Sequence, residues 1–200
     1  PTNFDGIPVL NNMSATFYGF KDDRRIDDIE NLWKLFEIAL KLDKQHDNAK
    51  YQNDFINAYN VVKGQFCVKW NITMGLYWIR PYRFINLDSR NRWFITKTDN
   101  PPADYAVLAN NVLSRNEIPS GEVYRDMCKR YIGYMKTRKS RYTSFPELSY
   151  YAWMESDNVN KNQIKDKKKK EKSNAEFLKW FAPVIRALRD LGGSATAADT

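Results

Sequence analysis

The chain has 200 residues, with 32 lysines and arginines against 24 aspartates and glutamates, and a formal net charge of +8. Hydrophobic residues make up 42% and aromatic residues 14%, which argues against a wholly disordered chain. No apolar run approaches the roughly 18 residues of a membrane-spanning helix, and the first ten residues lack the basic cluster of a signal peptide. We therefore expect one or two domains and no membrane partner.

Few residues are suited to catalysis or metal binding. Cys67 and Cys128 are too few for a disulfide framework and are predicted to be buried reduced thiols of a cytoplasmic protein. His46 alone cannot build a histidine metal site, and neither a glycine-rich phosphate loop nor a serine nucleophile motif occurs. The sequence predicts no catalytic residue, no metal and no cofactor. Because it lacks an initiator methionine, we expect a piece of a longer protein.

Helical periodicity dominates the first part of the chain. One predicted helix carries an apolar stripe of Ile29, Leu32, Trp33, Phe36, Ala39 and Leu40. Asp27 and Asp28 favour the positive end of its dipole, and the polar stretch 41–48 ends it.

Two further helices are predicted before residue 81. Phe55, Tyr59 and Val62 mark the first of them, which ends near Gly64. A short apolar helix over 73–79 must stop at Pro81, since proline disfavours helix at the residue before it. A strand over 65–73 is a second-ranked alternative because apolar residues alternate there.

Arginines are interleaved with aromatic residues between positions 77 and 95. The candidate nucleic-acid-binding residues of this segment are Arg80, Arg83, Arg90 and Arg92. Guanidinium groups bind phosphates bidentately, and aromatic faces such as those of Trp78 and Trp93 can stack on exposed bases. The alternative is that these tryptophans belong to the core while the arginines pair with Asp88 and other carboxylates. Both interpretations remain open at this point.

Helix-capping residues divide the rest of the first 156 residues. Phe84 and Leu87 should pack inward, and Asp88 or Ser89 should cap the next helix. An apolar stripe is expected at Tyr105, Leu108, Ala109, Val112 and Leu113. Ser120 should cap a longer helix whose inner positions are Val123, Tyr124, Met127, Cys128, Tyr131, Ile132 and Met135. Ser144 and Glu147 form a capping box that opens a helix through Met154.

A lysine-rich run, KNQIKDKKKKEK, occupies residues 161–172 and holds seven lysines against Asp166 and Glu171. One interpretation is a solvated tether, because like charges repel and extend the chain. The other is contact with a phosphate backbone, in which each lysine releases a counterion and gives affinity without sequence choice. The candidate nucleic-acid-binding residues of this run are Lys167, Lys168, Lys169 and Lys170.

The C-terminal piece is short and amphipathic. Pro183 is suited to the first turn of a helix, whose apolar face would be Val184, Ile185, Leu188 and Leu191. Gly192 and Gly193 should end that helix. We thus predict a helical domain over 1–156, a basic linker over 157–173 and an incomplete winged helix over 174–200.

Three stretches of the chain belong together in a resemblance to a known family. They are FDGIPVLNN (4–12) with FYGF (17–20), GLYWIRP (75–81) through LDSRNR (87–92), and FPELSYYAW (145–153). Together they resemble the region upstream of the ATPase in McrB-like AAA+ proteins of modification-dependent restriction systems. Separately, FAPVIRALRDLGGSA (181–195) resembles the opening helix of the Mrr-type N-terminal winged-helix domain. Neither family's ATP-binding or nuclease motif is present, so the resemblance implies no catalytic residue.

These observations lead to a mainly α fold and to a working hypothesis on function. The resemblance implies a non-catalytic, DNA-engaging accessory region of a bacterial restriction or phage-defence protein, with DNA and the other domains of that protein as partners. The alternative is a structural coupling or protein-interaction domain that links modules of a larger ATPase or nuclease.

Overall fold

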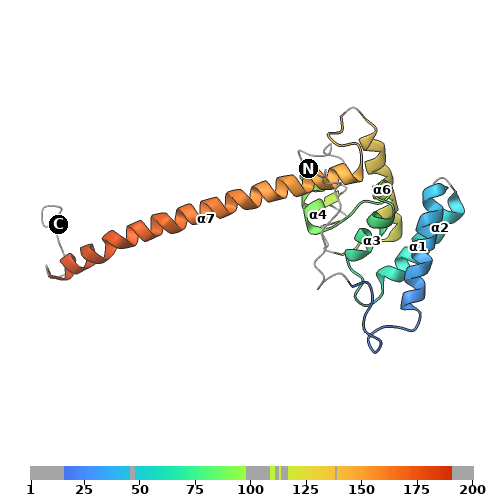
Figure 1. The fold of residues 1–200 in the computed structure, drawn as a ribbon, viewed down its shortest axis with the longest axis horizontal. Helices are drawn as coiled ribbons and strands as arrows, with labels where there is room; N and C mark the ends of the chain where they lie inside the picture. Colours follow the sequence, from blue (N-terminus) through green and yellow to red (C-terminus); the bar gives the residue numbers. More distant parts are fainter. Residues whose placement is uncertain are drawn as a thin grey trace, which may run out of the picture. The chain divides into compact units, whose positions relative to one another are not determined.

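The computed structural model describes residues 16–45, 48–97, 109–110, 113, 117–137 and 139–190. Its helices (Figure 1) are α1 (Asp28–Lys44), α2 (Ala49–Lys63), α3 (Asn71–Ile79), α4 (Ser89–Ile95), α6 (Gly121–Met135) and α7 (Phe145–Asp190). No β-strand occurs in these ranges, so the predicted mainly α fold is confirmed. The chain divides into two compact units, Pro1–Ser156 (unit 1) and Asp157–Thr200 (unit 2), and α7 belongs partly to each.

The helix predicted around residues 29–40 exists as α1, but its buried stripe differs from the prediction. Leu35, Ala39 and Leu42 are buried and form the core-facing side of α1. Trp33, which we expected in the core, is 63% exposed. The apolar residues of α1 fall on two adjoining stripes, and periodicity alone does not say which of them faces the core.

Helix α2 begins and ends where its sequence signals lie. The Asn48 side chain caps it by accepting hydrogen bonds from the backbone N–H groups of Lys50 and Tyr51 at 3.0 and 3.4 Å. Gly64 is its C-cap, as predicted. The alternative strand over 65–73 is wrong, because Cys67 has a φ of 67° and Val68 donates a turn hydrogen bond to the Gln65 carbonyl. A positive φ is incompatible with a strand.

The centre of unit 1 is a non-helical segment, residues 84–87, whose four side chains are all buried. Three of its backbone polar groups bond to side chains of neighbouring helices. The Ile85 carbonyl accepts the Tyr124 hydroxyl at 2.7 Å, the Ile85 N–H donates to Cys128 Sγ at 3.5 Å, and the Leu87 N–H donates to Thr73 Oγ1 at 3.0 Å. Phe84 and Leu87 pack inward as predicted.

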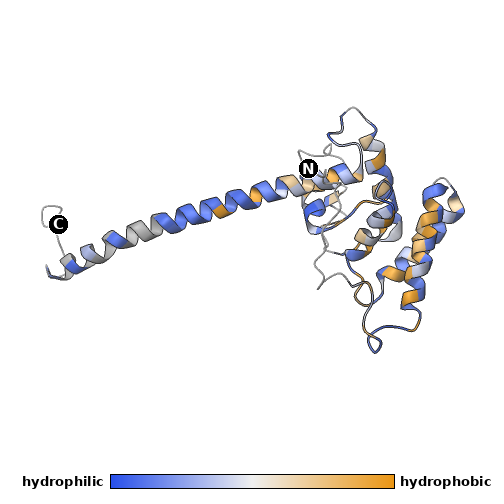
Figure 2. Ribbon diagram, viewed as in Figure 1, coloured by the Kyte–Doolittle hydropathy of each residue, from blue (hydrophilic) through white to orange (hydrophobic). Residues whose placement is uncertain are grey.

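Stacked aromatic rings join α2, this central segment and α6. Phe55 stacks on Phe84 with ring centroids 5.2 Å apart, and Tyr59 stacks on Tyr124 at 5.1 Å. Phe84 and Tyr124 are also nearly parallel, at 6.4 Å. All four rings are buried, so they supply a large share of the apolar area removed from water. Figure 2 shows hydrophobic and hydrophilic residues mixed along the helices of unit 1, whereas the stretch of α7 in unit 2 is mostly hydrophilic.

The predicted caps of α4 and α6 are confirmed. Asp88 accepts the N–H of Asn91 at 2.8 Å, and Ser120 accepts that of Val123 at 3.4 Å. Val123, expected inside, is 39% exposed.

At the start of α7, Ser144 accepts the Glu147 N–H at 3.4 Å, but Glu147 reaches back to Thr143, not Ser144. The Ser144 cap is therefore confirmed, and only the return bond of the capping box is displaced by one residue. The stripe predicted at 105–113 lies largely outside the described residues, as do His46 and Gly192–Gly193.

Helix α7 runs through the lysine-rich run and ends at Asp190. Residues 157–173, expected to be extended by charge repulsion, are helical. Lysine and glutamate are good helix formers, and this stretch contains neither glycine nor proline. Pro183 lies inside α7, so the prediction that it opens a separate helix is wrong. Strong helix formers on both sides, among them Ala182, Arg186 and Ala187, favour continuation across the proline.

Two glycines of α6 should respond in opposite ways to alanine. A Cβ at Gly121 would lie 2.9 Å from the Ile56 carbonyl oxygen and 3.0 Å from the Ile56 Cα, so the α2 backbone would have to move. We expect Gly121→Ala to lower the free energy of unfolding by about 1–3 kcal/mol. A Cβ at Gly133 meets nothing within 4 Å, so Gly133→Ala should raise it by about 0.5–1 kcal/mol. Urea denaturation of both variants tests this; equal effects would show that α2 and α6 do not approach so closely.

Candidate functional site

Two of the predicted arginines form ion pairs with a carboxylate far away in the sequence. Asp43, near the end of α1, lies 2.8 Å from Arg80 Nε and 3.5 Å from Arg83 Nε. Each of these side chains is about one third exposed. For Arg80 and Arg83 the carboxylate-pairing alternative is therefore the one the structure shows, with Asp43 in place of Asp88.

The other two arginines of the segment lie on α4. Arg92 stacks over the Trp70 ring, with its guanidinium carbon 4.0 Å from the ring centroid. Burial lowers the pKa of Arg92, and this effect outweighs the nearby Asp88 carboxylate, which would raise the pKa. Arg90 is exposed, and no ion pair joins it to another described residue. Because Trp70 precedes α3 and Arg80 follows it, Arg92 and Arg80 lie at opposite ends of that helix and do not form one cluster.

A second set of cations is held by Glu155 of α7. Lys97 Nζ lies 3.2 Å and Arg141 Nη1 2.6 Å from its carboxylate. Burial alone would raise the pKa of Glu155, but the hydrogen bonds and charges of Arg141 and Lys97 outweigh it and hold the pKa below its usual value. Lys97 also lies 3.8 Å from the centroid of Trp93, which is half-buried. Trp93 is thus a platform for a cation at the edge of the core, and it is neither fully buried nor fully exposed.

The lysines of unit 2 are arranged differently. All residues from Lys161 to Lys172 are exposed on α7. At 100° per residue, the four candidates Lys167–Lys170 point in four directions around the helix. Lys161, Lys165, Lys168 and Lys172 instead follow a 4-3-4 spacing and share one side, which we call the lysine face. Three of these were not among the sequence-based candidates, although their spacing would have found them once a helix was assumed.

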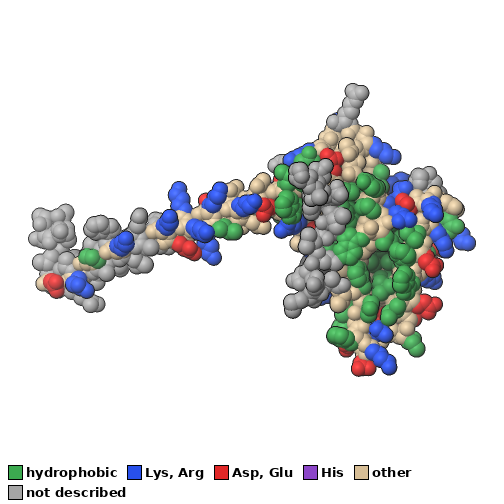
Figure 3. All heavy atoms as spheres, viewed as in Figure 1, with side chains coloured by type: hydrophobic (Ala, Val, Ile, Leu, Met, Phe, Trp, Pro, Cys, Tyr) green, Lys and Arg blue, Asp and Glu red, His purple; other side chains and the backbone are tan. Residues whose placement is uncertain are grey.

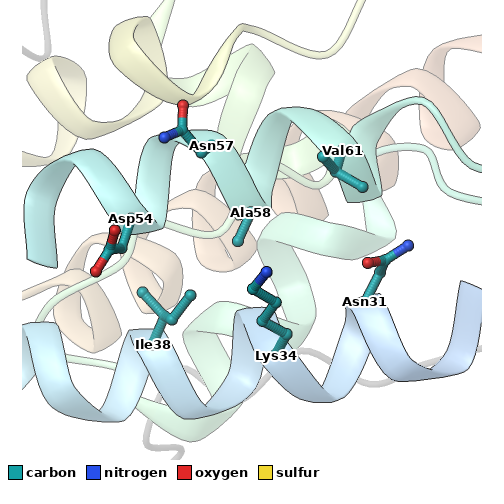
Figure 4. Close-up of a pocket in the computed structure, with 7 residues that line it drawn as sticks. All are labelled: Asn31, Lys34, Ile38, Asp54, Asn57, Ala58 and Val61. Carbon is teal, nitrogen blue, oxygen red and sulfur yellow. The ribbon is translucent and has the colours of Figure 1, made fainter. Parts of the chain in front are cut away.

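A shallow pocket of about 310 Å³ lies between α1 and α2 (Figure 4). Its floor is apolar and comes from Ile38, Ala58 and Val61, and its rim is polar. Lys34 reaches from α1 toward α2, whereas the Asn57 amide points away from α1. Asp54 supplies the carboxylate of the rim. The lining contains no nucleophile with an adjacent base, so its chemistry is limited to binding.

Other chemically reactive groups of unit 1 serve packing. Burial raises the pKa of the Cys128 thiol to about 12, which keeps it protonated and unreactive. Burial also raises the pKa values of Tyr59 and Tyr124 well above their usual range. Within the described ranges, no three His, Cys, Asp or Glu side chains gather where they could hold a metal ion. Over the same ranges, every helix is too short or too polar to cross a membrane.

The Asp43 ion pairs predict a specific energetic coupling. In a double-mutant cycle, Asp43→Asn and Arg80→Ala should show a coupling of about 0.5–1 kcal/mol, the range of partly exposed pairs. Arg90→Ala, as the control, should leave the free energy of unfolding unchanged within ±0.5 kcal/mol. Urea denaturation of the four proteins and the control measures both quantities. Additive losses from Asp43 and Arg80 would contradict the pairing.

The buried thiol predicts a loss of stability at high pH. An unfolded cysteine ionises near pH 8.5, whereas Cys128 in the folded protein does so at about 12. Its contribution is therefore complete below about pH 8.5 and is lost as the pH rises toward 12. In urea denaturation between pH 8 and 11, Cys128→Ala should show a shallower decline than the wild type. Parallel declines would show that the folded thiol ionises normally.

Comparison with known proteins identifies a family for unit 1. Residues 1–155 match the family described as Domain of unknown function (DUF8425). This match ends beside the boundary between units 1 and 2 at Ser156. Neither a curated protein nor a solved structure matches the chain. Because the match covers well over half of the sequence, the chain belongs to the DUF8425 family.

Proposed function

We propose that the chain binds the phosphate backbone of duplex DNA, without catalysis, through the lysine face of α7. The observation that carries this proposal is the lysine face itself, formed by Lys161, Lys165, Lys168 and Lys172 on an exposed helix. The acidic residues of the run, Asp166 and Glu171, fall on other sides of the helix. Among the residues whose side chains the structure describes, Asp157 competes for the face, because its carboxylate lies 2.6 Å from Lys161 Nζ.

The dimensions of the lysine face suit a nucleic-acid backbone. Its first and last lysines are eleven positions apart in the sequence, which corresponds to roughly 17 Å of helix. Duplex DNA carries one charge per roughly 1.7 Å of its axis, so several phosphates lie within that length. The lysine ammonium group is a point charge without bidentate geometry. Its contacts with phosphates therefore do not depend on the DNA sequence. We therefore expect salt-sensitive, non-specific affinity.

The arginine segment supports this function less than the lysine face does. Arg80 and Arg83 share the Asp43 carboxylate, and Arg92 is spread over the Trp70 ring. Arg90 is the member of the segment best exposed for a phosphate contact. Any DNA contact of unit 1 is therefore expected to be centred on Arg90 and to be secondary to α7.

The resemblance to McrB-like and Mrr-type proteins suggests the setting for this activity. We place the chain in the cytoplasm, as an accessory region of a modification-dependent restriction or phage-defence protein, with the other domains of that protein as partners. Binding to methylated and unmodified duplexes of one sequence tests this setting apart from DNA binding itself. Equal affinities would leave the recognition of modified bases to other domains.

A second candidate function is a coupling or protein-interaction domain. The observation in its favour is that several cations of unit 1 pair with carboxylates of the same unit, while large apolar side chains are exposed. Asp43 and Glu155 between them hold four cations, whereas Trp33, Phe66 and Tyr82 are each at least 60% exposed. Surfaces of this composition favour protein partners over phosphates.

Two triple variants of equal charge test the lysine face. Lys165, Lys168 and Lys172 are changed to glutamine in one protein, and Lys167, Lys169 and Lys170 in the other. If the face contacts DNA, the slope of log affinity against log salt should fall by up to about 3 × 0.9 in the first protein and by clearly less in the second. Fluorescence anisotropy with a labelled duplex at several salt concentrations measures the slope, and circular dichroism checks that helix content is kept.

Two outcomes would contradict the proposal. Equal slopes in the two variants would mean that the lysines act as a diffuse cationic tether, not as a face. An unchanged slope in both would mean that the run does not meet phosphates at all, and the coupling function would then be favoured.

A further inference from the structure

An apolar strip on α1 lies outside the core. Ile29, Trp33, Phe36 and Leu40, which we call the α1 edge, repeat with a 4-3-4 spacing and therefore share one side of the helix. Trp33 is 63% exposed and the other three are partly exposed. Leu35, Ala39 and Leu42 already fill the core-facing side. The α1 edge is thus a second apolar surface, with the 4-3-4 spacing of helices that pack on another helix.

The α1 edge continues into an apolar groove between α1 and α3. The groove has a volume of about 250 Å³ and is lined by apolar side chains, among them Leu32 and Phe36 of α1 and Ile72 and Leu76 of α3. The Trp33 ring meets Phe36 edge-on at 5.7 Å, which joins the exposed strip to the groove. Figure 3 shows hydrophobic side chains gathered on this face of unit 1, over α3 and α1.

The charged residues beside the α1 edge are acidic at the start of α1 and basic at its end. Glu30 lies in the first turn of α1, and Lys41 and Lys44 lie in its last turn. All three are exposed, and all three fall on the same flank of the α1 edge. Phe36 is the midpoint of the helix, between the acidic end and the basic end.

We propose that the α1 edge binds the α1 edge of a second copy of this chain, with the two helices antiparallel about a two-fold axis near Phe36. A two-fold axis keeps equivalent flanks together, so Glu30 of each chain meets Lys44 of the other. Both ion pairs form at once, while the exposed Trp33 of each chain is buried between the helices. A parallel arrangement would place equivalent flanks on opposite sides of the interface, so neither ion pair would form.

The charges also distinguish a second copy from other occupants. A nucleic acid would meet Glu30 and Glu37 beside the apolar strip, which disfavours it. Glu37 lies near the proposed axis and one turn from Lys41 of its own helix, which offsets its repulsion across the axis. A helix with one acidic end and one basic end is complementary to itself only when reversed. This inference does not depend on DNA binding.

The apolar contact is tested first, with Trp33→Ser in the full-length chain. Because Trp33 is largely exposed, the variant should keep the thermal midpoint of unit 1. We expect the wild type to dimerise and the variant to dissociate at least tenfold more readily, as measured by sedimentation equilibrium up to about 100 µM. A wild type that stays monomeric over this range, or a dimer that Trp33→Ser leaves intact, overturns the proposal.

Charge exchange tests the antiparallel arrangement. Glu30→Lys alone opposes two lysines at each end, and Lys44→Glu alone opposes two glutamates, so each variant should dimerise roughly three- to tenfold more weakly. Mixed together, the two variants should form a heterodimer in which both ion pairs are restored, one in its original sense and one with reversed sign. Lys129→Glu, an exposed change on α6, is the control and should not affect assembly. If the mixture associates no better than either variant alone, the antiparallel pairing is wrong.

Discussion

The fold of unit 1 depends on supplying hydrogen-bond partners to a buried stretch of non-helical backbone. Residues 84–87 cross the core without a helix or a sheet to satisfy their polar groups, and an unpaired buried group costs roughly 1–3 kcal/mol. Tyr124, Cys128 and Thr73 supply the missing partners from two different helices. The same requirement places α3 and α6 on either side of the segment. Tyr124 therefore has two roles at once, as a stacked ring and as a hydrogen-bond donor.

The caps explain why so much of the fold could be predicted. Asp88 and Ser120 act within three residues of their own positions, so local sequence is enough to locate the starts of α4 and α6. The rotational phase of α1 could not be predicted in this way. Its two apolar stripes look alike in the sequence, and only packing against α2 selects Leu35 and Leu42 over Trp33. The continuation of α7 through Pro183 likewise depended on helix formers on both sides outweighing one unfavourable residue.

The partners of the charged residues in the candidate sites could not be predicted from local sequence either. Arginines and aromatic residues close together in sequence suggested one phosphate-binding cluster, yet their partners come from elsewhere. Asp43 of α1 forms ion pairs with Arg80 and Arg83, and the Trp70 ring contacts the Arg92 guanidinium. No pattern within residues 77–95 contains that information. The lysine face was missed because its members are not consecutive in the sequence. They share one side only when the run is helical, whereas the consecutive residues Lys167–Lys170 do not.

The lysine face has a further consequence for the helix that carries it. Lys161, Lys165, Lys168 and Lys172 stand one turn apart, so their like charges repel each other and oppose helix formation. A polyanion that binds them removes this repulsion in the helical state alone. Ligand affinity and helix content are then thermodynamically linked, and each must strengthen the other to the same degree. A substitution far along α7 that only loosens the helix would thereby weaken binding without touching a single contact.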